Sequence, residues 1–259
     1  MKITSQDITK LGHSNSGSLT HNEINKISGA LANTGFIFLP GQTLYDLLLN
    51  EALDLHERWS DFQESWNHLK KDTFMADGGD YRLRRHAIYA IPQHSQEIAP
   101  AAYMPHYQSL DHNSLNGGVA RHFSPLGAAT CINPVFMQIL ALCRDVVCAV
   151  APGCAWHVEV HQFRIETAGP GASPTPEGLH RDGVDYVFMM MIRRRHISGG
   201  ITSLCSPCGE LVCQHTFTQE MEAAFIDDIR LLHGVSAIEP VTAGTRGYRD
   251  MLVITFCKA

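Results

Sequence analysis

The stretch His157-Val-Glu-Val-His-Gln-Phe-Arg-Ile-Glu166 is rich in β-branched and aromatic residues at alternating positions, which predicts a β-strand. Glycine- and proline-rich turns, such as Pro170-Gly171 and Gly199-Gly200, separate this stretch from later segments of similar composition. Short strands between such turns favour a sandwich or barrel over alternating βαβ units. We therefore predict an all-β core with the topology of a double-stranded β-helix, or jelly roll. Its further strands are expected at residues 185–192, 210–217, 226–238 and 248–256.

The part of the chain before Trp156 is predicted to be mainly helical. Apolar residues recur at helical spacing near residues 20–31, and residues 44–70 have the pattern of one long amphipathic helix. Asn133-Pro134 is typical of an N-cap and first turn, so another long helix is expected after it. The N-terminal helices are expected to pack on one sheet of the β core.

The length of 259 residues fits one β-rich domain with added helices. Hydrophobic residues make up 44% of the chain and charged residues 18%, so a sizeable core can form. We predict a single α+β domain over residues 1–259, with a mainly helical part at 1–155 and the β core at 156–259.

The charge and the N-terminus limit the partners and the location of the protein. A formal net charge of −6 argues against broad binding to nucleic acids or anionic membranes, because their phosphates would be repelled. The N-terminus lacks the apolar segment of a signal peptide, and the longest apolar runs are too short to span a bilayer. Eight irregularly spaced cysteines favour reduced thiols. These features predict a cytoplasmic protein, and a homodimer is compatible with them.

His180-Arg-Asp182 places an imidazole and a carboxylate two residues apart. If this segment is a strand, both side chains point to the same face and can reach one ion. A second histidine, His233, lies beside a turn farther along the strand-rich half. Two histidines and one carboxylate can occupy one face of an octahedron and leave three positions open, as in non-haem iron(II) oxygenases. His180, Asp182 and His233 are therefore the predicted ligands of an Fe(II) ion.

Such a centre has room for O2 and for a bidentate 2-oxoacid such as 2-oxoglutarate, whose far carboxylate then needs a cation. Arginine is the best partner for a buried carboxylate. Arg249 opens the last predicted strand, and Arg246 in the preceding turn is the second choice. If Arg249 faces the cavity, alternation puts Met251, Val253 and Thr255 on the cavity face, and Asp250, Leu252, Ile254 and Phe256 toward the helices.

Gln162 and Arg164 share one face of the strand at residues 157–166 and are predicted to line the 2-oxoglutarate pocket. The alternative is that His161, Phe163 and Ile165 point inward, since alternation by itself does not choose between the two faces.

Four residues are predicted to contact the substrate. Tyr81, Arg82 and Arg84 are candidates to anchor a substrate carboxylate, with a solvated basic stretch as the alternative. Tyr186 is a candidate to line the substrate pocket, with a packed strand tyrosine as the alternative.

Thr175-Pro-Glu-Gly-Leu-His-Arg-Asp-Gly-Val-Asp-Tyr186 resembles the signature of bacterial Fe(II)/2-oxoglutarate-dependent dioxygenases, the family that includes L-isoleucine 4-hydroxylase. The stretches at residues 81–85, 115–123 and 160–165 are similar to that family as well. The resemblance implies a double-stranded β-helix, an Fe(II) centre, and 2-oxoglutarate and O2 as co-substrates. It also implies that the metal ligands are His180, Asp182 and His233 and that Arg249 anchors 2-oxoglutarate, with Arg246 left open.

By the same resemblance, the expected reaction is hydroxylation of an aliphatic C–H bond of a small molecule, a free L-amino acid, with release of succinate and CO2. Asp182 favours hydroxylation over halogenation, because halogenating relatives lack this carboxylate; desaturation and epimerisation stay open. Gly199-Gly-Ile-Thr202 departs from the family pattern, in which an acidic residue follows the two glycines. Because of this departure the identity of the substrate stays open, and a dipeptide or a carrier-bound substrate is an alternative to the free amino acid.

Two rival hypotheses stand beside this one. The first is a catalytically silent β-barrel that binds a small ligand or a partner protein, which would need neither the three metal ligands nor the arginine. The second is a metal-dependent dioxygenase or hydrolase that does not use 2-oxoglutarate.

Overall fold

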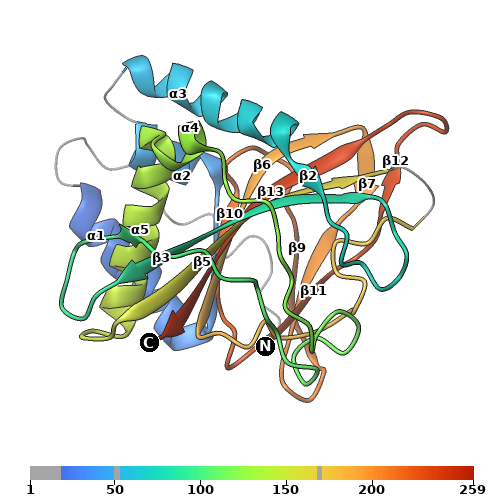
Figure 1. Ribbon diagram of the computed structural model, residues 1–259. Coiled ribbons are helices and arrows are strands. Elements are labelled where there is room, and N and C mark those ends of the chain that lie inside the picture. The colour runs from blue at the N-terminus through green and yellow to red at the C-terminus, as the bar shows by residue number, and fades with distance from the viewer. Residues whose placement is uncertain (1–18, 50–52, 168–170) are drawn as a thin grey trace.

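The computed structural model describes residues 19–49, 53–167 and 171–259, which form antiparallel β layers with helices packed on one side (Figure 1). The larger sheet has eight strands in the order β1-β10-β6-β13-β5-β3-β2, with β4 paired to β3. Its strands are β1 (Phe36–Leu39), β2 (Lys70–Lys71), β3 (Arg82–Ile91), β4 (Ala99–Pro100), β5 (Trp156–Glu166), β6 (Tyr186–Arg195), β10 (Ala223–Asp227) and β13 (Tyr248–Lys258).

A second layer faces the inner side of this sheet. It contains the three-stranded sheet β11-β8-β9 and the pair β12-β7. Val187, Met189 and Met251 of the large sheet pack against Leu204 and Phe217 in a core between the layers. The antiparallel β core that the sequence predicts is thereby confirmed. The strands of the second layer are β7 (Ile197–Gly199), β8 (Ile201–Cys205), β9 (Leu211–Thr216), β11 (Leu232–Val235) and β12 (Ile238–Pro240).

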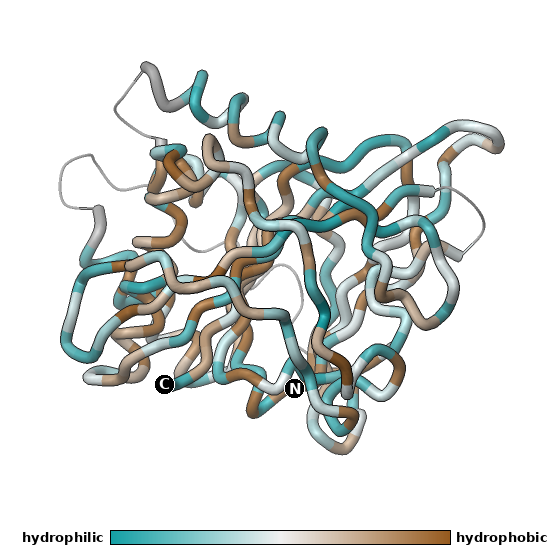
Figure 2. Tube along the Cα trace, viewed as in Figure 1, coloured by the Kyte–Doolittle hydropathy of each residue, from teal (hydrophilic) through white to brown (hydrophobic). Residues whose placement is uncertain are grey.

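The helices cover the outer face of the large sheet, where apolar residues of both concentrate (Figure 2). Ile27 and Leu31 of α1 and Phe136 and Ile139 of α5 belong to the same buried cluster as apolar side chains of β5, β6 and β13. None of the described helices is long and apolar enough to span a membrane. They are α1 (Leu19–Thr34), α2 (Gly41–Leu49), α3 (Leu53–Glu64), the 3-10 helix η2 (Ser65–His68), α4 (Ala128–Cys131) and α5 (Pro134–Val150).

The predicted start of α5 is confirmed. The Asn133 side chain accepts hydrogen bonds from the backbone N–H groups of Val135 and Phe136, at 2.9 and 3.3 Å. Pro134 occupies the first turn, where its missing N–H has no partner to lose.

The prediction of a mainly helical part over residues 1–155 is wrong for much of the described chain. β3 is a ten-residue strand of the large sheet, and residues 101–127 form no helix. Residues 44–70, predicted as one helix, contain the separate elements α2, α3 and η2 and end at β2. Local spacing missed β3 because its three arginines and one histidine are uncommon in strands, and its pairing with β5 is long-range.

β13 has the two faces that its alternation predicts. Arg249, Met251, Val253 and Thr255 line an internal cavity, while Leu252, Ile254 and Phe256 pack in the helical core. A register irregularity between Asp250 and Met251 interrupts the pairing of β13 with β6.

For β5 the alternative assignment of faces is the correct one. His161, Phe163 and Ile165 line the cavity, whereas the Gln162 side chain donates to Ser65 Oγ at 2.7 Å on the helical side. Arg164 is also on the helical side, where it forms a two-pronged ion pair with Asp250, both N···O distances being 2.7 Å. The prediction that Gln162 and Arg164 line the 2-oxoglutarate pocket is therefore wrong. Arg164 instead explains why an acidic residue is tolerated at position 250.

The Arg164–Asp250 pair provides a test of this arrangement, because the Asp250 side chain is fully buried. Asp250→Ala leaves the guanidinium without its carboxylate and is expected to lower the free energy of unfolding by about 3–5 kcal/mol. Glu64→Ala is the control. It removes the exposed partner of Arg193, 3.4 Å away, and should cost roughly 0–1 kcal/mol. Urea denaturation measures both, and equal losses for the two variants would contradict the assigned role of the pair.

Candidate active site

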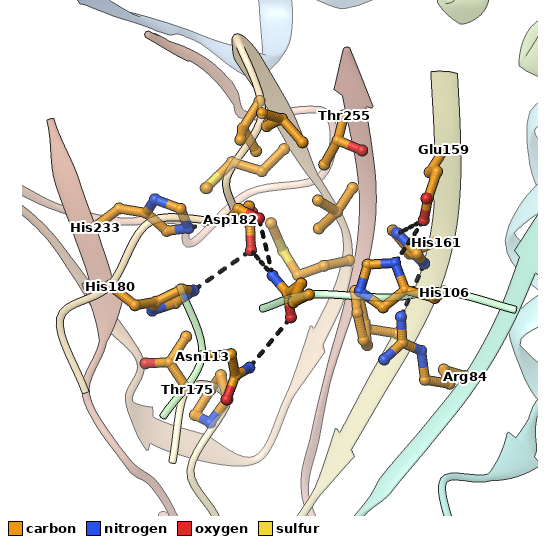
Figure 3. A pocket seen from close by; sticks show the side chains of 18 of the residues that line it. Arg84, His106, Asn113, Glu159, His161, Thr175, His180, Asp182, His233 and Thr255 are labelled. Atoms are coloured by element: carbon orange, nitrogen blue, oxygen red, sulfur yellow. Dashed lines mark hydrogen bonds and ion pairs between the residues drawn. The ribbon is translucent and has the colours of Figure 1, made fainter. Parts of the chain in front are cut away.

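His180, Asp182 and His233 meet at one end of the cavity (Figure 3). His233 belongs to β11, and His180 joins it through an isolated antiparallel bridge with two backbone hydrogen bonds of 2.9 Å. Each of the three side chains offers one ligand atom, and these atoms lie within 4.8 Å of one another. The His-x-Asp pair lies in the segment before β6 and not in a regular strand, so the strand premise of the prediction was wrong although the three side chains do converge.

Both imidazoles direct Nε2 toward the carboxylate. His180 Nε2 is 3.6 Å from Asp182 Oδ1, and His233 Nε2 is 3.6 Å from Asp182 Oδ2. The Nδ1 atom of His180 donates to the carbonyl of Gly178 at 3.0 Å, and His233 Nδ1 lies 3.4 Å from Asp228 Oδ1. A hydrogen bond like that of His180 fixes the orientation of a metal-binding imidazole and leaves Nε2 free, whereas the contact of His233 with Asp228 is not a hydrogen bond.

Two more side chains hold Asp182 in place. Asp228 accepts the backbone N–H groups of Asp182, Gly183 and Val184, at 3.1, 2.8 and 3.2 Å. Gln108 donates to Asp182 Oδ1 at 3.0 Å, which leaves Oδ2 as the less engaged oxygen. The carboxylate is therefore oriented before any ion binds.

The charges of the three side chains suit a cation. Burial lowers the pKa of His180, but the hydrogen bond and negative charge of Asp182 outweigh burial and raise it to about 9. Burial raises the pKa of Asp182, but the two histidines outweigh it and hold that pKa below its ordinary range. A bound metal ion replaces such a proton. Two imidazoles and one carboxylate on one side of an ion are a donor set that fits Fe(II) and leaves positions open.

The cavity has a volume of about 270 Å³ and lies between the large sheet and the second layer. Apolar side chains of β6 and β13 form its middle part, and the metal-binding side chains stand at one end. Glu159, His161, His106 and Arg84 gather at the opposite wall (Figure 3).

Arg249 lies in the cavity wall and is only 5% exposed. Within the described part of the chain, no carboxylate comes within 4.0 Å of its guanidinium, and its Nε has no hydrogen-bond partner. Burial, and then the charge of Arg194, lower the pKa of Arg249 to about 9, so it still carries its charge at neutral pH. A Cβ atom on Gly200 would lie 3.7 Å from Arg249 Cδ and 3.2 Å from Arg194 Nη1, so glycine leaves room for both arginines. Arg246 is exposed in the turn before β13 and does not line the cavity.

The predicted substrate residues divide into two groups. Arg82 and Arg84 of β3 line the cavity. Tyr81 does not: its hydroxyl donates to Asp77, and its ring packs near Ile165 outside the cavity. Tyr186 packs against Trp156 on the helical side, with ring centroids 5.9 Å apart. The substrate-binding prediction for both tyrosines is therefore wrong: neither lines the cavity, since Tyr186 faces the helices and Tyr81 packs beyond the cavity against Ile165 and Ile197.

Glu159 is surrounded by His86, His106, His157 and His161. Three of these histidines and Glu159 have atoms close enough together to hold a metal ion. Arg84 Nη2, however, lies 2.8 Å from His161 Nδ1. Because a guanidinium only donates, His161 carries its proton on Nε2, which faces Glu159 and is then no metal ligand. The group is therefore a buried carboxylate held by imidazole donors.

Four further residues that line the cavity are not among those predicted from the sequence: Gln108, Arg121, Glu159 and Glu177. Arg121 falls in the stretch at residues 115–123 and Glu177 in the stretch at residues 175–186, both noted for their resemblance to a known family. No local pattern marks Gln108, since it lies in a segment without helix or extended strand.

The family model for 2OG-Fe dioxygenases matches residues 63–255, so the chain belongs to this family of oxygenases. Members use Fe(II), 2-oxoglutarate and O2, in agreement with the predicted cofactors and with the His-Asp-His group.

Individual relatives cover nearly the whole chain. A BsmA homologue from Methylobium petroleophilum PM1 is 30% identical, and its crystal structure matches with a TM-score of 0.80 over 90% of this chain and 92% of that one. L-isoleucine-4-hydroxylase from Bacillus thuringiensis is 21% identical over 232 residues, which are 88% of this chain and 90% of the relative. The structure of IDO from the same organism matches with a TM-score of 0.76 at 17% identity, over 95% and 99% of the two chains. These matches confirm the double-stranded β-helix core.

Removal of one imidazole tests the metal centre. His180→Ala is expected to weaken Mn(II) binding by more than about 100-fold, beyond the roughly 10- to 100-fold effect of changing a residue that only supports a ligand. Equilibrium dialysis of the purified protein measures this, and Mn(II) is a stable substitute for Fe(II). His122→Ala is the control, because His122 is exposed and does not line the cavity. Unchanged Mn(II) affinity in His180→Ala would rule out the assigned centre.

Proposed function

We propose that this dioxygenase hydroxylates an aliphatic C–H bond of a free L-amino acid and releases succinate and CO2, with His180, Asp182 and His233 holding the metal. The observation that carries the proposal is the buried charge of Arg249 in the same cavity as the three metal-binding side chains. A charge without a partner in a buried wall is costly, and a carboxylate ligand offsets that cost.

Each end of 2-oxoglutarate has a partner in this arrangement. Arg249 would bind the far carboxylate, and the keto-acid end would reach the metal held by His180, Asp182 and His233. When bound, Fe(II) supplies the redox chemistry by which O2 converts 2-oxoglutarate to succinate and CO2 and a C–H bond becomes C–OH. The side chains contribute binding, orientation and exclusion of water.

The wall between the two ends suits an aliphatic substrate. Val187, Met189, Met251 and Val253 line it, so a hydrocarbon side chain can lie against apolar surface near the metal. The cavity volume of about 270 Å³ is close to the lower end of small-ligand pockets, roughly 300–1,000 Å³. A small substrate therefore fits better than a polymer. Asp182 occupies the position that halogenating enzymes leave free, which favours hydroxylation.

One relative also supports a free amino acid as the substrate. L-isoleucine-4-hydroxylase, by its name, acts on an aliphatic amino acid, and it aligns with 88% of this chain. The cavity of this chain has the features that such a substrate needs: an apolar wall and buried charged groups.

A turnover screen tests the proposal. The purified protein is incubated with Fe(II), ascorbate and 2-oxoglutarate and each of the standard L-amino acids, and succinate and product mass are measured. One or more amino acids are expected to stimulate succinate release and to gain one oxygen atom, and His180→Ala should abolish both. Succinate formed without a hydroxylated amino acid would mean that the substrate class is wrong. No succinate from protein that binds Mn(II) would favour a silent binding protein.

A further inference from the structure

Besides Arg82, which is paired with Asp72, and Glu159, which is surrounded by histidines, three buried charged side chains of the cavity are used neither by the metal centre nor by 2-oxoglutarate. They are Arg84, Arg121 and Glu177, from β3, the loop before α4 and the segment before His180.

Arg121 is 2% exposed, and its guanidinium has a neutral partner. Its Nη2 donates to Gln108 Oε1 at 2.6 Å, and its Nε has no hydrogen-bond partner. In the described part of the chain no carboxylate lies within 4.0 Å of it. Burial lowers the pKa of Arg121, as expected for a cation without a counter-ion.

Arg84 shares its carboxylate with a neighbour. Asp72 lies 2.8 Å from Arg82 Nε and 3.6 Å from Arg84 Nη1, so one negative charge serves two guanidiniums. The Nε of Arg84 has no hydrogen-bond partner. Arg84 and Arg121 both lie near the ring of Phe123, 3.5 and 5.9 Å from its centroid, so the excess positive charge is concentrated in one place.

Glu177 is a buried negative charge without a full set of partners in the part of the chain that the structure describes. Its side chain is 8% exposed, Oε2 has no hydrogen-bond partner, and Oε1 lies 3.5 Å from His180 Nε2, the atom that faces the metal position. The other extra carboxylate of the cavity, Glu159, already has four imidazole partners. The charge of Glu159 is thus already shared among imidazole donors, whereas Glu177 Oε2 is free to accept from a cationic ligand.

Hydrogen bonds connect these groups to the metal centre. Gln108 accepts from Arg121 with its amide oxygen and donates to Asp182 with its amide nitrogen, at 2.6 and 3.0 Å. Arg121 is thus one amide group away from Asp182, and Glu177 stands beside His180. Arg121 and Glu177 therefore both border the metal-binding side chains, while Arg84 lies on the opposite wall of the cavity (Figure 3).

We propose that Arg121 binds the α-carboxylate and Glu177 the α-ammonium of the substrate, with the charge of Arg84 adding to the attraction of the carboxylate, so that the part of the cavity beside the metal centre is a site for the zwitterionic head group of a free α-amino acid. This inference rests on the proposed function and narrows it. An amino acid presents both charges on one carbon, and each would meet a buried group of opposite charge. Substrates with a blocked carboxylate or amine, such as carrier-bound amino acids, N-acyl amino acids and most positions of a peptide, would leave one buried charge unpaired.

The test measures binding without turnover, with Mn(II)- and 2-oxoglutarate-loaded protein and isothermal titration calorimetry. The probe is the tightest-binding standard L-amino acid, compared with its carboxamide and with its deaminated acid. Arg121→Gln is expected to weaken the amino acid by roughly 10- to 100-fold, the effect of losing a charge-assisted hydrogen bond, but to change the carboxamide little. Glu177→Gln should weaken the amino acid and the carboxamide by a similar factor and leave the deaminated acid nearly unchanged.

Arg85→Gln is the matched control. Arg85 is next to Arg84 on β3 but points away from the cavity, where it donates to the carbonyls of His68 and Pro125. The Arg85→Gln variant should bind all three probes with the affinity of the wild type. Thermal unfolding and Mn(II) affinity of each variant show whether the fold and the metal centre are intact.

Several outcomes overturn the inference: no L-amino acid binds, the variants weaken all three probes equally, or Glu177→Gln loses Mn(II) affinity instead of amino-acid affinity. The last result would make Glu177 part of the metal centre. The turnover screen separates this inference from the proposed function. Charge-dependent binding without succinate release would leave the head-group site standing and contradict the oxygenase. Succinate release stimulated only by molecules that lack one of the two charges would contradict the head-group site and leave the oxygenase activity standing.

Discussion

The charge of Arg249 in the cavity wall is the constraint on which the arrangement of the site depends. Its guanidinium is 5% exposed and has no carboxylate partner in the described part of the chain. Burial of such a charge is costly unless a ligand supplies the missing anion. Elsewhere in the same cavity, Asp182 is positioned by Gln108 and Asp228 beside the two histidines. The cavity therefore presents a cation-binding group and a cation that has no carboxylate partner among the described residues, and under the proposed function the metal ion and the far carboxylate of 2-oxoglutarate bind to them.

The two faces of β5 and β13 make this charge pattern compatible with a stable fold. On the outer face apolar side chains pack under α1 and α5, and the Arg164–Asp250 pair neutralises itself at 2.7 Å. On the inner face the same strands present Arg249 and Glu159 to the cavity. Because successive side chains of a strand point to opposite sides, β13 presents Asp250 of this ion pair on its outer face and Arg249 on its inner face. The glycines at 199 and 200 adopt positive φ angles of 72° and 70°, and Gly200 leaves the space that Arg194 and Arg249 occupy.

Much of the β core and the metal-binding residues could be predicted from the sequence. For β13, the need for a cation in the cavity pointed to Arg249, and alternation then gave the faces of the residues that follow, as the structure has them. The alternation of β5 was ambiguous, because each face carries polar residues, and only the contacts of Gln162 with Ser65 and of Arg164 with Asp250 show which face is turned to the helices. β3 was missed for a related reason, since its arginines are paired by groups distant in sequence. Gln108 and Arg121 belong to an irregular segment whose path no local spacing defines.

The role of Arg249 as the partner of the far carboxylate is tested most directly by an anaerobic titration of the Fe(II)-loaded protein with 2-oxoglutarate and with pyruvate. The visible absorption of the 2-oxoacid complex measures binding. Pyruvate can chelate the metal but lacks the far carboxylate. The wild type should bind 2-oxoglutarate more tightly than pyruvate, and Arg249→Gln should raise the Kd for 2-oxoglutarate roughly 10- to 100-fold and leave that for pyruvate nearly unchanged. Arg246→Gln, an exposed neighbour, should behave like the wild type. Equal affinity of the wild type for the two acids, or a loss confined to Arg246→Gln, would contradict the account.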